Sequence, residues 1–192
     1  MDIFSAFGLS ASAGLNAYIP LLVVALLGKF TNLFTLSSPW NTLESWWVIG
    51  LLVVLSIIEF FADKIPAINH VNDIIQTVIR PIAGAIVFAA SARIITDIHP
   101  VLAMVMGLLV AGTVHAVKAL AIRPAVTATT GGAGNVPVSI AEDVLSTIIS
   151  IVAAITPVLI AVILVLVGAY LVLWIWRRTN RERAKSKYPE VR

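Results

Sequence analysis

The sequence contains no cysteine among its 192 residues, and charged residues make up only 12% of it. The absence of cysteine excludes disulfides, a thiolate nucleophile and any metal site built on sulfur ligands. The scarcity of charge excludes more, because soluble domains carry about 25% charged residues. Half of that charge leaves too little polar surface to cover a globule in water. An ordinary soluble enzyme, a disordered chain and a nucleic-acid-binding protein are therefore excluded.

Apolar residues make up 59% of the chain and occur in runs long enough for helices that cross a bilayer, which takes about 20 residues. They predict an all-α protein, a polytopic transmembrane helical bundle of about six spans in which some helices are re-entrant or broken. The expected spans are Leu9–Leu27, Trp46–Phe61, Ile74–Ile95, Val101–Ala121, Val138–Ile155 and Pro157–Trp176. Alternatively, the last two form one long helix kinked at Pro157. The transmembrane domain then covers residues 1–176.

Positive charge is concentrated in a basic tail, residues 177–192, which holds seven of the 13 lysines and arginines. Such a tail directly after an apolar run is typical of the cytoplasmic side of a membrane, and it also attracts anionic lipid. Six spans with a cytoplasmic tail put eleven positive charges inside and two outside, whereas five spans give nine and four. We therefore expect six spans and two cytoplasmic termini.

Two pairs of matching segments indicate an internal repeat of a helical hairpin. The pairs are residues 48–57 with 105–114 and residues 71–79 with 141–149. The first pair aligns Gly50 with Gly107, and the second aligns Asp73 with Asp143. The copies, at about residues 46–97 and 101–156, are expected to run in the same direction, as in transporters built from parallel repeats.

Charged residues inside the apolar segments are candidates for function, because a charge at the bilayer centre costs from about 2.5 to more than about 10 kcal/mol. These residues are Glu59, Asp73, Arg80, His115, Lys118, Arg123, Glu142 and Asp143. Asp73, Thr77 and Arg80 are spaced to share one helix face. Asp143 and Thr147 hold matching positions in the second copy. We expect the two polar stripes to face each other as a seam.

Three interpretations of this seam are open. In the first, it is an ion-pair network that holds the bundle together, with Arg80 paired to Asp143 or Asp73. In the second, it binds a cation, a proton or an anionic substrate. In the third, its charged side chains reach the membrane surface by snorkelling.

A glycine-rich segment over residues 127–137 is a second candidate site. Gly131, Gly132 and Gly134 allow backbone N–H groups to point inward as an anion-binding nest beside the start of a helix. Arg123 precedes the segment and Asn135 lies within it. A plain flexible loop is an equally good interpretation, and the absence of the P-loop Lys-Ser/Thr ending argues against nucleotide binding.

The segment around Asn16 has a similar composition of small residues. Asn16 is followed by Pro20, as Asn135 is followed by Pro137. Asparagine suits a helix cap and proline suits a first helical turn. These positions are either ordinary helix starts or broken helices that line a site.

Other chemistry is not indicated. The three histidines are scattered without metal-site spacing, and no nucleophile elbow occurs. We therefore expect no metal site, no cofactor and no catalytic residue. Small residues such as Gly84, Ala85 and Ala89 predict close helix packing, in a compact bundle or in a homo-oligomer.

Four strings are specific enough to indicate a family. They are residues 8–21 (GLSASAGLNAYIPL), 59–66 (EFFADKIP), 70–81 (HVNDIIQTVIRP) and 130–135 (TGGAGN). They closely resemble the bacterial membrane family catalogued as domain of unknown function 4126. The resemblance covers about residues 8–170. It implies a multi-pass protein of the bacterial inner membrane, and it supplies neither an activity nor a catalytic residue.

The favoured function is a transporter or channel for an ion or a small anionic solute. Asp73, Arg80 and Asp143 would form its centre, with further contacts from Thr77, Thr147, Glu59, Asn16, Asn135, Arg123 and the glycines Gly131, Gly132 and Gly134. The alternative is a scaffold or lipid-binding protein whose buried charges are structural. A membrane enzyme that acts on a lipid phosphate is a third, weaker hypothesis. The expected partners are the lipid bilayer, anionic lipid at the basic tail and a second copy of the chain.

Overall fold

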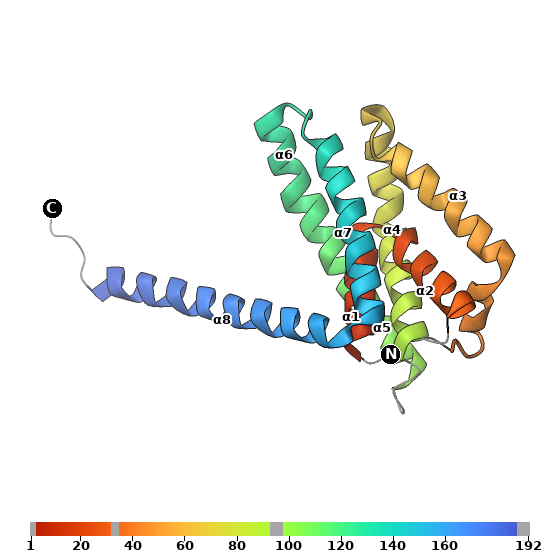
Figure 1. Ribbon diagram of the computed structural model, residues 1–192. Helices are drawn as coiled ribbons and strands as arrows, with labels where there is room; N and C mark the ends of the chain where they lie inside the picture. Colours follow the sequence, from red (N-terminus) through yellow and green to blue (C-terminus); the bar gives the residue numbers. More distant parts are fainter. Residues whose placement is uncertain (1–2, 32–34, 93–97, 188–192) are drawn as a thin grey trace.

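Helices form all the regular structure in the computed structural model, which describes residues 3–31, 35–92 and 98–187 (Figure 1). In chain order they are α1 (Ile3–Leu15), α2 (Tyr18–Phe30), the 3₁₀ turn η1 (Trp40–Glu44), α3 (Trp46–Ala62), α4 (Pro66–Ala92), α5 (Pro100–Val117), the π turn η2 (Lys118–Ile122), α6 (Arg123–Thr130), α7 (Asn135–Ile155) and α8 (Pro157–Lys187). No strand occurs in these ranges. The predicted all-α class is confirmed.

The chemistry of the end residues explains several helix boundaries. The Ser45 hydroxyl accepts a hydrogen bond from the backbone N–H of Val48 and so caps α3. Pro100 occupies the first turn of α5, where its missing N–H costs no helical bond. α6 ends at Gly131, whose φ of 62° lies in the left-handed region that favours glycine.

Three of the described helical segments are long and apolar enough to cross a membrane. They cover Val71–Ser91, Pro100–Thr130 and Asn135–Ile155. Their outward faces carry large apolar side chains that the rest of the chain leaves exposed, such as Ile74 and Leu109. An apolar surface of this extent is unfavourable in water and matches the hydrocarbon of a bilayer. The chain is therefore a helical membrane protein.

The first apolar segment is a helical hairpin that enters and leaves the bundle at the same end (Figure 1). α1 and α2 have 13 residues each, which is about 20 Å of helix. At the start of α1, Phe7 packs in one cluster with Trp40 and Ile98. At the end of α2, Lys29 donates to the backbone oxygen of Glu44, which belongs to the same η1 turn as Trp40. The turn between the two helices lies deep in the bundle.

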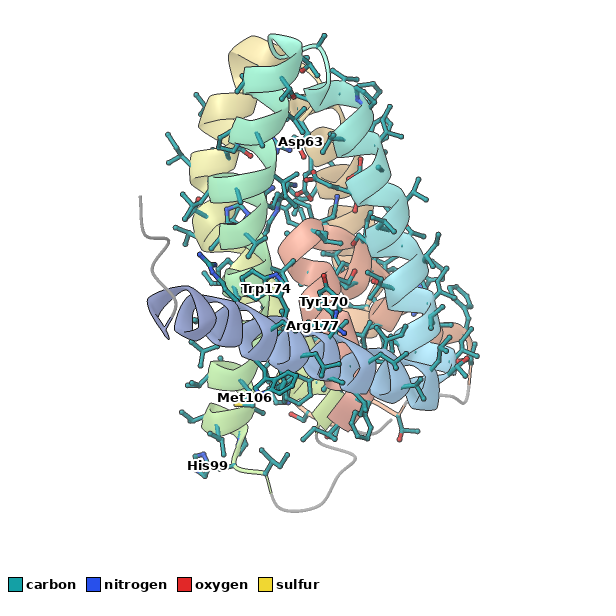
Figure 2. The ribbon with its side chains drawn as sticks, turned by 90° about the vertical axis from the view of Figure 1, so that its left-hand side faces the viewer. Asp63, His99, Met106, Tyr170, Trp174 and Arg177 are labelled. Carbon is teal, nitrogen blue, oxygen red and sulfur yellow. The ribbon has the colours of Figure 1, made fainter. Side chains whose placement is uncertain are left out.

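This hairpin corrects the expected single span Leu9–Leu27. The helix breaks at Asn16, and the chain reverses there. Figure 2 shows Asp63, which follows α3, and His99, which precedes α5, at opposite ends of the bundle. α1 begins at the His99 end, whereas the six-span prediction places the N-terminus at the Asp63 end. The number of membrane crossings stays a prediction.

α1 lies among α4, α5 and α7 and contacts all three. Ser10 and Ser12 make this central position favourable, because both hydroxyls find buried partners. The Ser12 hydroxyl lies 2.7 Å from both the Ser146 and the Ser150 hydroxyls, and Ser10 donates to the backbone oxygen of Gly84 at 2.9 Å. Because α1 lies between α4 and α7, their polar stripes do not pack face to face as expected.

α4 and α5 cross closely at two glycines. A Cβ atom on Gly107 would overlap the backbone oxygen of Gly84 and the Cβ atom of Phe88. A Cβ atom on Gly84 would overlap Ala111 and the backbone oxygen of Gly107. The small-residue surface expected from Gly84, Ala85 and Ala89 is thus buried inside the bundle.

α7 and α8 are separate helices rather than one kinked helix. α7 ends at Ile155, and Thr156 leaves the helical conformation with φ −133° and ψ 68°. α8 then runs sideways from the bundle (Figure 1). The side chains of residues 179–192, most of the basic tail, lie outside the described residues, as do residues 93–95 of the expected third span.

The directions of the helices agree with a parallel repeat. α3 and α5 run one way through the bundle, and α4 and α7 run the other way (Figure 1). Thr77 bonds to the backbone oxygen of Asp73, and Thr147 bonds in the same way to that of Asp143. The 13 extra residues of the second copy are largely η2 and α6. The repeat itself stays a prediction.

The matched glycines Gly50 and Gly107 provide a test of the packing. We expect Gly107→Ala to lower the free energy of unfolding by about 1–3 kcal/mol, because the new methyl group forces α4 and α5 apart. Gly50→Ala is the control, since nothing lies within 4 Å of its added Cβ, and it should stabilise α3 by about 0.5–1 kcal/mol. Thermal unfolding in detergent, followed by tryptophan fluorescence, measures both. Equal stability of the two variants would contradict this packing.

Candidate functional site

The turn of the α1–α2 hairpin brings two helix ends to one buried place. The Asn16 Oδ1 atom accepts from the backbone N–H groups of Tyr18 and Ile19, at 3.1 Å each, and so caps α2. The Asn16 Nδ2 atom donates to Asp143 Oδ1 at 3.0 Å. The last carbonyl of α1, on Leu15, accepts from Lys118 Nζ at 3.2 Å. Both helix ends therefore find side-chain partners.

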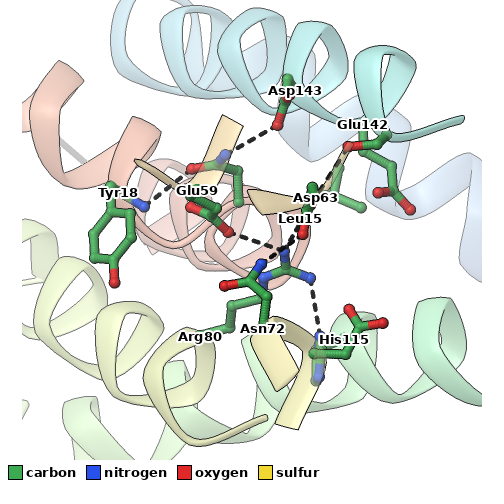
Figure 3. A network of polar contacts seen from close by, with 12 residues as sticks. Leu15, Tyr18, Glu59, Asp63, Asn72, Arg80, His115, Glu142 and Asp143 are labelled. Carbon is green, nitrogen blue, oxygen red and sulfur yellow. Dashed lines mark hydrogen bonds and ion pairs between the residues drawn. The ribbon is translucent and has the colours of Figure 1, made fainter. Parts of the chain in front are cut away.

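Arg80 is the most deeply buried charge next to this turn, with no exposed side-chain surface. Its Nη2 atom lies 2.9 Å from Glu59 Oε1 and 3.6 Å from Asp63 Oδ2. Its Nη1 atom lies 3.1 Å from His115 Nδ1, and the other ring nitrogen of His115 lies 3.2 Å from the Thr77 hydroxyl. Figure 3 shows this arrangement between α3, α4 and α5.

A π turn adds two further cations from one stretch of chain. Residues five apart on an α-helix point about 140° apart, but the η2 bond from the Arg123 N–H to the Lys118 carbonyl inserts an extra residue into the turn. Both side chains therefore reach Glu142 Oε2, Lys118 at 2.7 Å and Arg123 at 3.4 Å. Arg123 also contacts Asp63 at 3.2 Å and Asp73 at 3.1 Å.

Asp143 belongs to the edge of this arrangement. Its Oδ2 atom lies 3.1 Å from Lys64 Nζ, while its Oδ1 atom accepts from Asn16. Beside it, between α2, α3 and α7, is a hollow of about 340 Å³. The walls of the hollow are apolar apart from the polar residues Asn16, Ser56 and Asp143. Asp143 thus lies where the buried charges meet a space that is open to the outside of the bundle.

These ionisable residues form what we call the charge cluster: Glu59, Asp63, Lys64, Asp73, Arg80, Lys118, Arg123, Glu142 and Asp143. Five carboxylates face four cations, so the fully ionised cluster carries one net negative charge. Three carboxylate oxygens lack a hydrogen-bond partner, namely Glu59 Oε2, Asp73 Oδ1 and Glu142 Oε1. Within the described residues, no group of three or more side chains is arranged to hold a metal ion.

Asp63 is the carboxylate with the most cationic neighbours. It lies just beyond the end of α3 and contacts Arg80, Lys118 and Arg123 within 4.0 Å, and it also accepts from Asn72 at 2.6 Å. Burial disfavours its charged form, but the three cations and the amide outweigh burial and hold the pKa of Asp63 below its usual range. Asp63 is therefore ionised at neutral pH and holds together side chains from α4, η2 and α6.

The structure partly agrees with the predicted stripes. Asp73, Thr77 and Arg80 do share one face of α4, which points to Arg123 and His115. The expected pairing of Arg80 with Asp143 or Asp73 is wrong, because Arg80 turns to Glu59 and Asp63 instead. Asp143 lies beyond α1 on α7, and Asp73 pairs with Arg123. Thr147 bonds only to its own helix among the described contacts.

The glycine-rich segment does not join the charge cluster. Gly131, Gly132 and Gly134 form an exposed turn between α6 and α7. Asn135 exchanges hydrogen bonds with Thr127, on the other side of that turn. Within the described contacts, the segment acts as a helix connection, and its role in anion binding stays a prediction. Of the two asparagines predicted as site residues, Asn16 is the one that the fold brings to the charge cluster.

Two residues of the cluster, Asp63 and Lys64, were missed as site candidates. A signal was present for Asp63: Glu59 and Asp63 are four residues apart, so they lie on the same face at the end of an apolar helix. Like charges at this spacing repel each other, and an apolar helix has no local reason to keep them. Their spacing therefore indicates a shared cationic partner, which is Arg80.

Asp63 and Asp73 provide a matched pair for the energetics. We expect Asp63→Asn to lower the free energy of unfolding by about 3–5 kcal/mol, since it leaves buried cations without their shared partner. Asp73→Asn should cost only about 0–1 kcal/mol, because the Asp73 side chain is 24% exposed. Thermal unfolding in detergent gives both values. If Asp73→Asn lowered the free energy of unfolding more than Asp63→Asn, the expectation that the more buried carboxylate stabilises the fold more would be contradicted.

The comparisons with known proteins give a family and no closer relative. No curated protein matches the chain, and no solved structure matches it. The family described as "Domain of unknown function (DUF4126)" matches residues 3–178, which include every residue of the charge cluster. The chain therefore belongs to this family, as the resemblance of its four strings implies.

Proposed function

We propose that the protein is a transporter or channel for an ion or a small anionic solute, with the α1–α2 turn and the charge cluster as its central site. One observation carries this proposal: a re-entrant hairpin brings the end of α1 and the start of α2 to buried charges inside an apolar bundle. Broken helices whose ends meet polar groups at membrane depth are how many transporters form their binding sites.

The cost of this arrangement supports a role beyond packing. A non-helical backbone at membrane depth is tolerated only where protein or water covers it, and here Asn16 and Lys118 must supply the missing partners. Charged side chains at this depth are also costly and mark pathways for ions and solutes in other membrane proteins. A bundle that needed only stability would avoid both costs with a continuous apolar helix.

The hollow beside Asp143 supports an access route to the site. Asp143 and Asn16 line it, so a solute in the hollow would meet the start of α2 and the outer members of the charge cluster. Lys64, whose side chain is 14% exposed, contacts Asp143 there. A lysine and a helix N-terminus favour an anion, whereas Asp143 favours a cation or a proton.

A second candidate function is a scaffold or lipid-binding protein. It is favoured by the extent of ion pairing, because Arg80, Lys118 and Arg123 each contact at least two carboxylates. A network of this kind fixes the arrangement of α3 to α7 whether or not a solute passes. In this function, the basic tail would bind anionic lipid.

The cellular setting is part of the proposal. We propose the inner membrane of a bacterium, with the basic tail in the cytoplasm, as the distribution of positive charge favours. Self-association is proposed as well, because α8 leaves the bundle and its apolar residues, such as Val165 and Leu166, are exposed in the single chain. No catalytic role is proposed.

Electrical recording from reconstituted vesicles on a solid-supported membrane tests transport. The probes are chloride, sulfate, phosphate, acetate, sodium and potassium, each applied as a concentration jump. We expect a current with at least one of them that falls about tenfold or more in Asp143→Asn, since a charged hydrogen bond contributes about 1.5–3 kcal/mol. Glu44→Gln is the control, because Glu44 lies at the other end of the bundle. No current with any probe, together with a less stable Asp143→Asn, would favour the scaffold.

A further inference from the structure

Each carboxylate of the charge cluster contacts at least one cation, but five carboxylates and four cations leave one net negative charge when all are ionised. A net charge in an apolar bundle is unfavourable, so binding one cation would stabilise the cluster. Glu59 is the carboxylate at which neutralisation is most favourable. Its side chain is 1% exposed, its Oε1 atom pairs with Arg80, and its Oε2 atom is buried without a hydrogen-bond partner.

Glu59 is the inner end of a chain of alternating charges. The chain starts at Asp73, whose side chain is 24% exposed, and continues through Arg123 at 3.1 Å to Asp63 at 3.2 Å. It then reaches Arg80 at 3.6 Å and Glu59 at 2.9 Å. Exposure falls from 24% at Asp73 to 1% at Glu59. The chain therefore links the outside of the bundle to its buried end.

A proton fits Glu59 better than a metal ion does. Sodium, magnesium and calcium need several oxygen ligands around one point, and the described residues contain no group of three acidic or histidine side chains that offers them. A proton needs only one oxygen, which Glu59 Oε2 provides. After protonation, Glu59 Oε1 still accepts from Arg80, so the buried hydrogen bond is kept while the net charge is removed.

Several groups around Glu59 act on the proton. Arg80 from α4, at 2.9 Å, attracts the ionised carboxylate, whereas the negative charge of Asp63, four residues further along, repels it. Lys118 from η2 lies beyond Asp63, at 4.0 Å from its carboxylate. The Tyr18 side chain from α2 lies on the same side of the network as Glu59 (Figure 3), and His115 from α5 contacts the same Arg80. Arg80 is shared between Glu59 and Asp63. A neutral Glu59 thus keeps its hydrogen bond to Arg80 but attracts it less, which leaves a stronger attraction between Arg80 and Asp63.

We propose that Glu59 binds one exchangeable proton on Oε2, which it takes up from water and returns to water. The proton does not pass along the ion pairs, because the guanidinium groups of Arg80 and Arg123 stay protonated. No other bond forms or breaks in this step. The use of this proton as the coupling ion for transport rests on the function proposed above, whereas the proton site itself does not. When the proton leaves, the attraction between Arg80 and Glu59 strengthens, and the contact of Arg80 with Asp63 weakens.

Infrared difference spectroscopy of the full chain in lipid nanodiscs tests the proton site directly. Spectra recorded from mildly acidic to mildly alkaline pH show the carbonyl stretch of a protonated carboxylic acid. We expect this band to disappear as the pH rises in the wild type and in the control Glu44→Gln. It should be absent at every pH in Glu59→Gln. Glu59→Asp keeps a carboxyl group and should shift the frequency of the band. This shift would assign the band to residue 59 even if Glu59→Gln does not fold.

Three results would overturn the proton site. They are the absence of the band in the wild type at every pH, an unchanged band in Glu59→Gln, and loss of the band when sodium replaces choline at constant pH. The coupling has its own readout, which is the vesicle current with and without a pH gradient. A current that ignores the gradient refutes the coupling and leaves transport intact. No current with any probe refutes the proposed transport, and the infrared band still decides the proton site.

Discussion

The pairing of Arg80 with Glu59 and Asp63 is the interaction on which the rest of the bundle depends. A guanidinium group without exposed surface among apolar helices needs carboxylate partners. An unpaired charge there would destabilise the fold by far more than most packing contacts stabilise it. Those partners come from the end of α3, and Asp63 then draws in Lys118 and Arg123. Four helical elements, α3, α4, η2 and α6, are thereby fixed around one polar centre.

The α1–α2 hairpin is the second part of this arrangement. Its small residues let α1 lie among α4, α5 and α7, with Ser10 and Ser12 bonded to its neighbours. The same close packing separates α4 from α7 and so determines which charges can meet. Asn16 then has two tasks, because its oxygen caps α2 while its amide holds Asp143. The turn is positioned by the charges and in return closes the cluster on one side.

The cluster combines stability with an incomplete charge balance. Most of its ions contact two or more opposite charges, which is the pattern of a structural network. Yet one negative charge remains, and the oxygen without a partner on Glu59 lies at the most buried end. A network that served stability alone would be neutral, because every unpaired buried charge weakens the fold. The excess charge is therefore the feature that connects the energetics of the bundle with the proposed function.

The sequence by itself determined the class of the protein, its family strings and the residues that needed partners. Long apolar runs exclude a soluble fold whatever their arrangement, and a charge in such a run is costly wherever it lies. Helical periodicity was also enough to put Asp73, Thr77 and Arg80 on one face. Only the tertiary structure decided which charges meet. The reversal at Asn16, the π turn that aligns Lys118 with Arg123 and the position of α1 between α4 and α7 depend on contacts between distant segments. The spacing of residues along the chain does not predict such contacts, because the energy of an ion pair or hydrogen bond depends on the distance between its atoms in space.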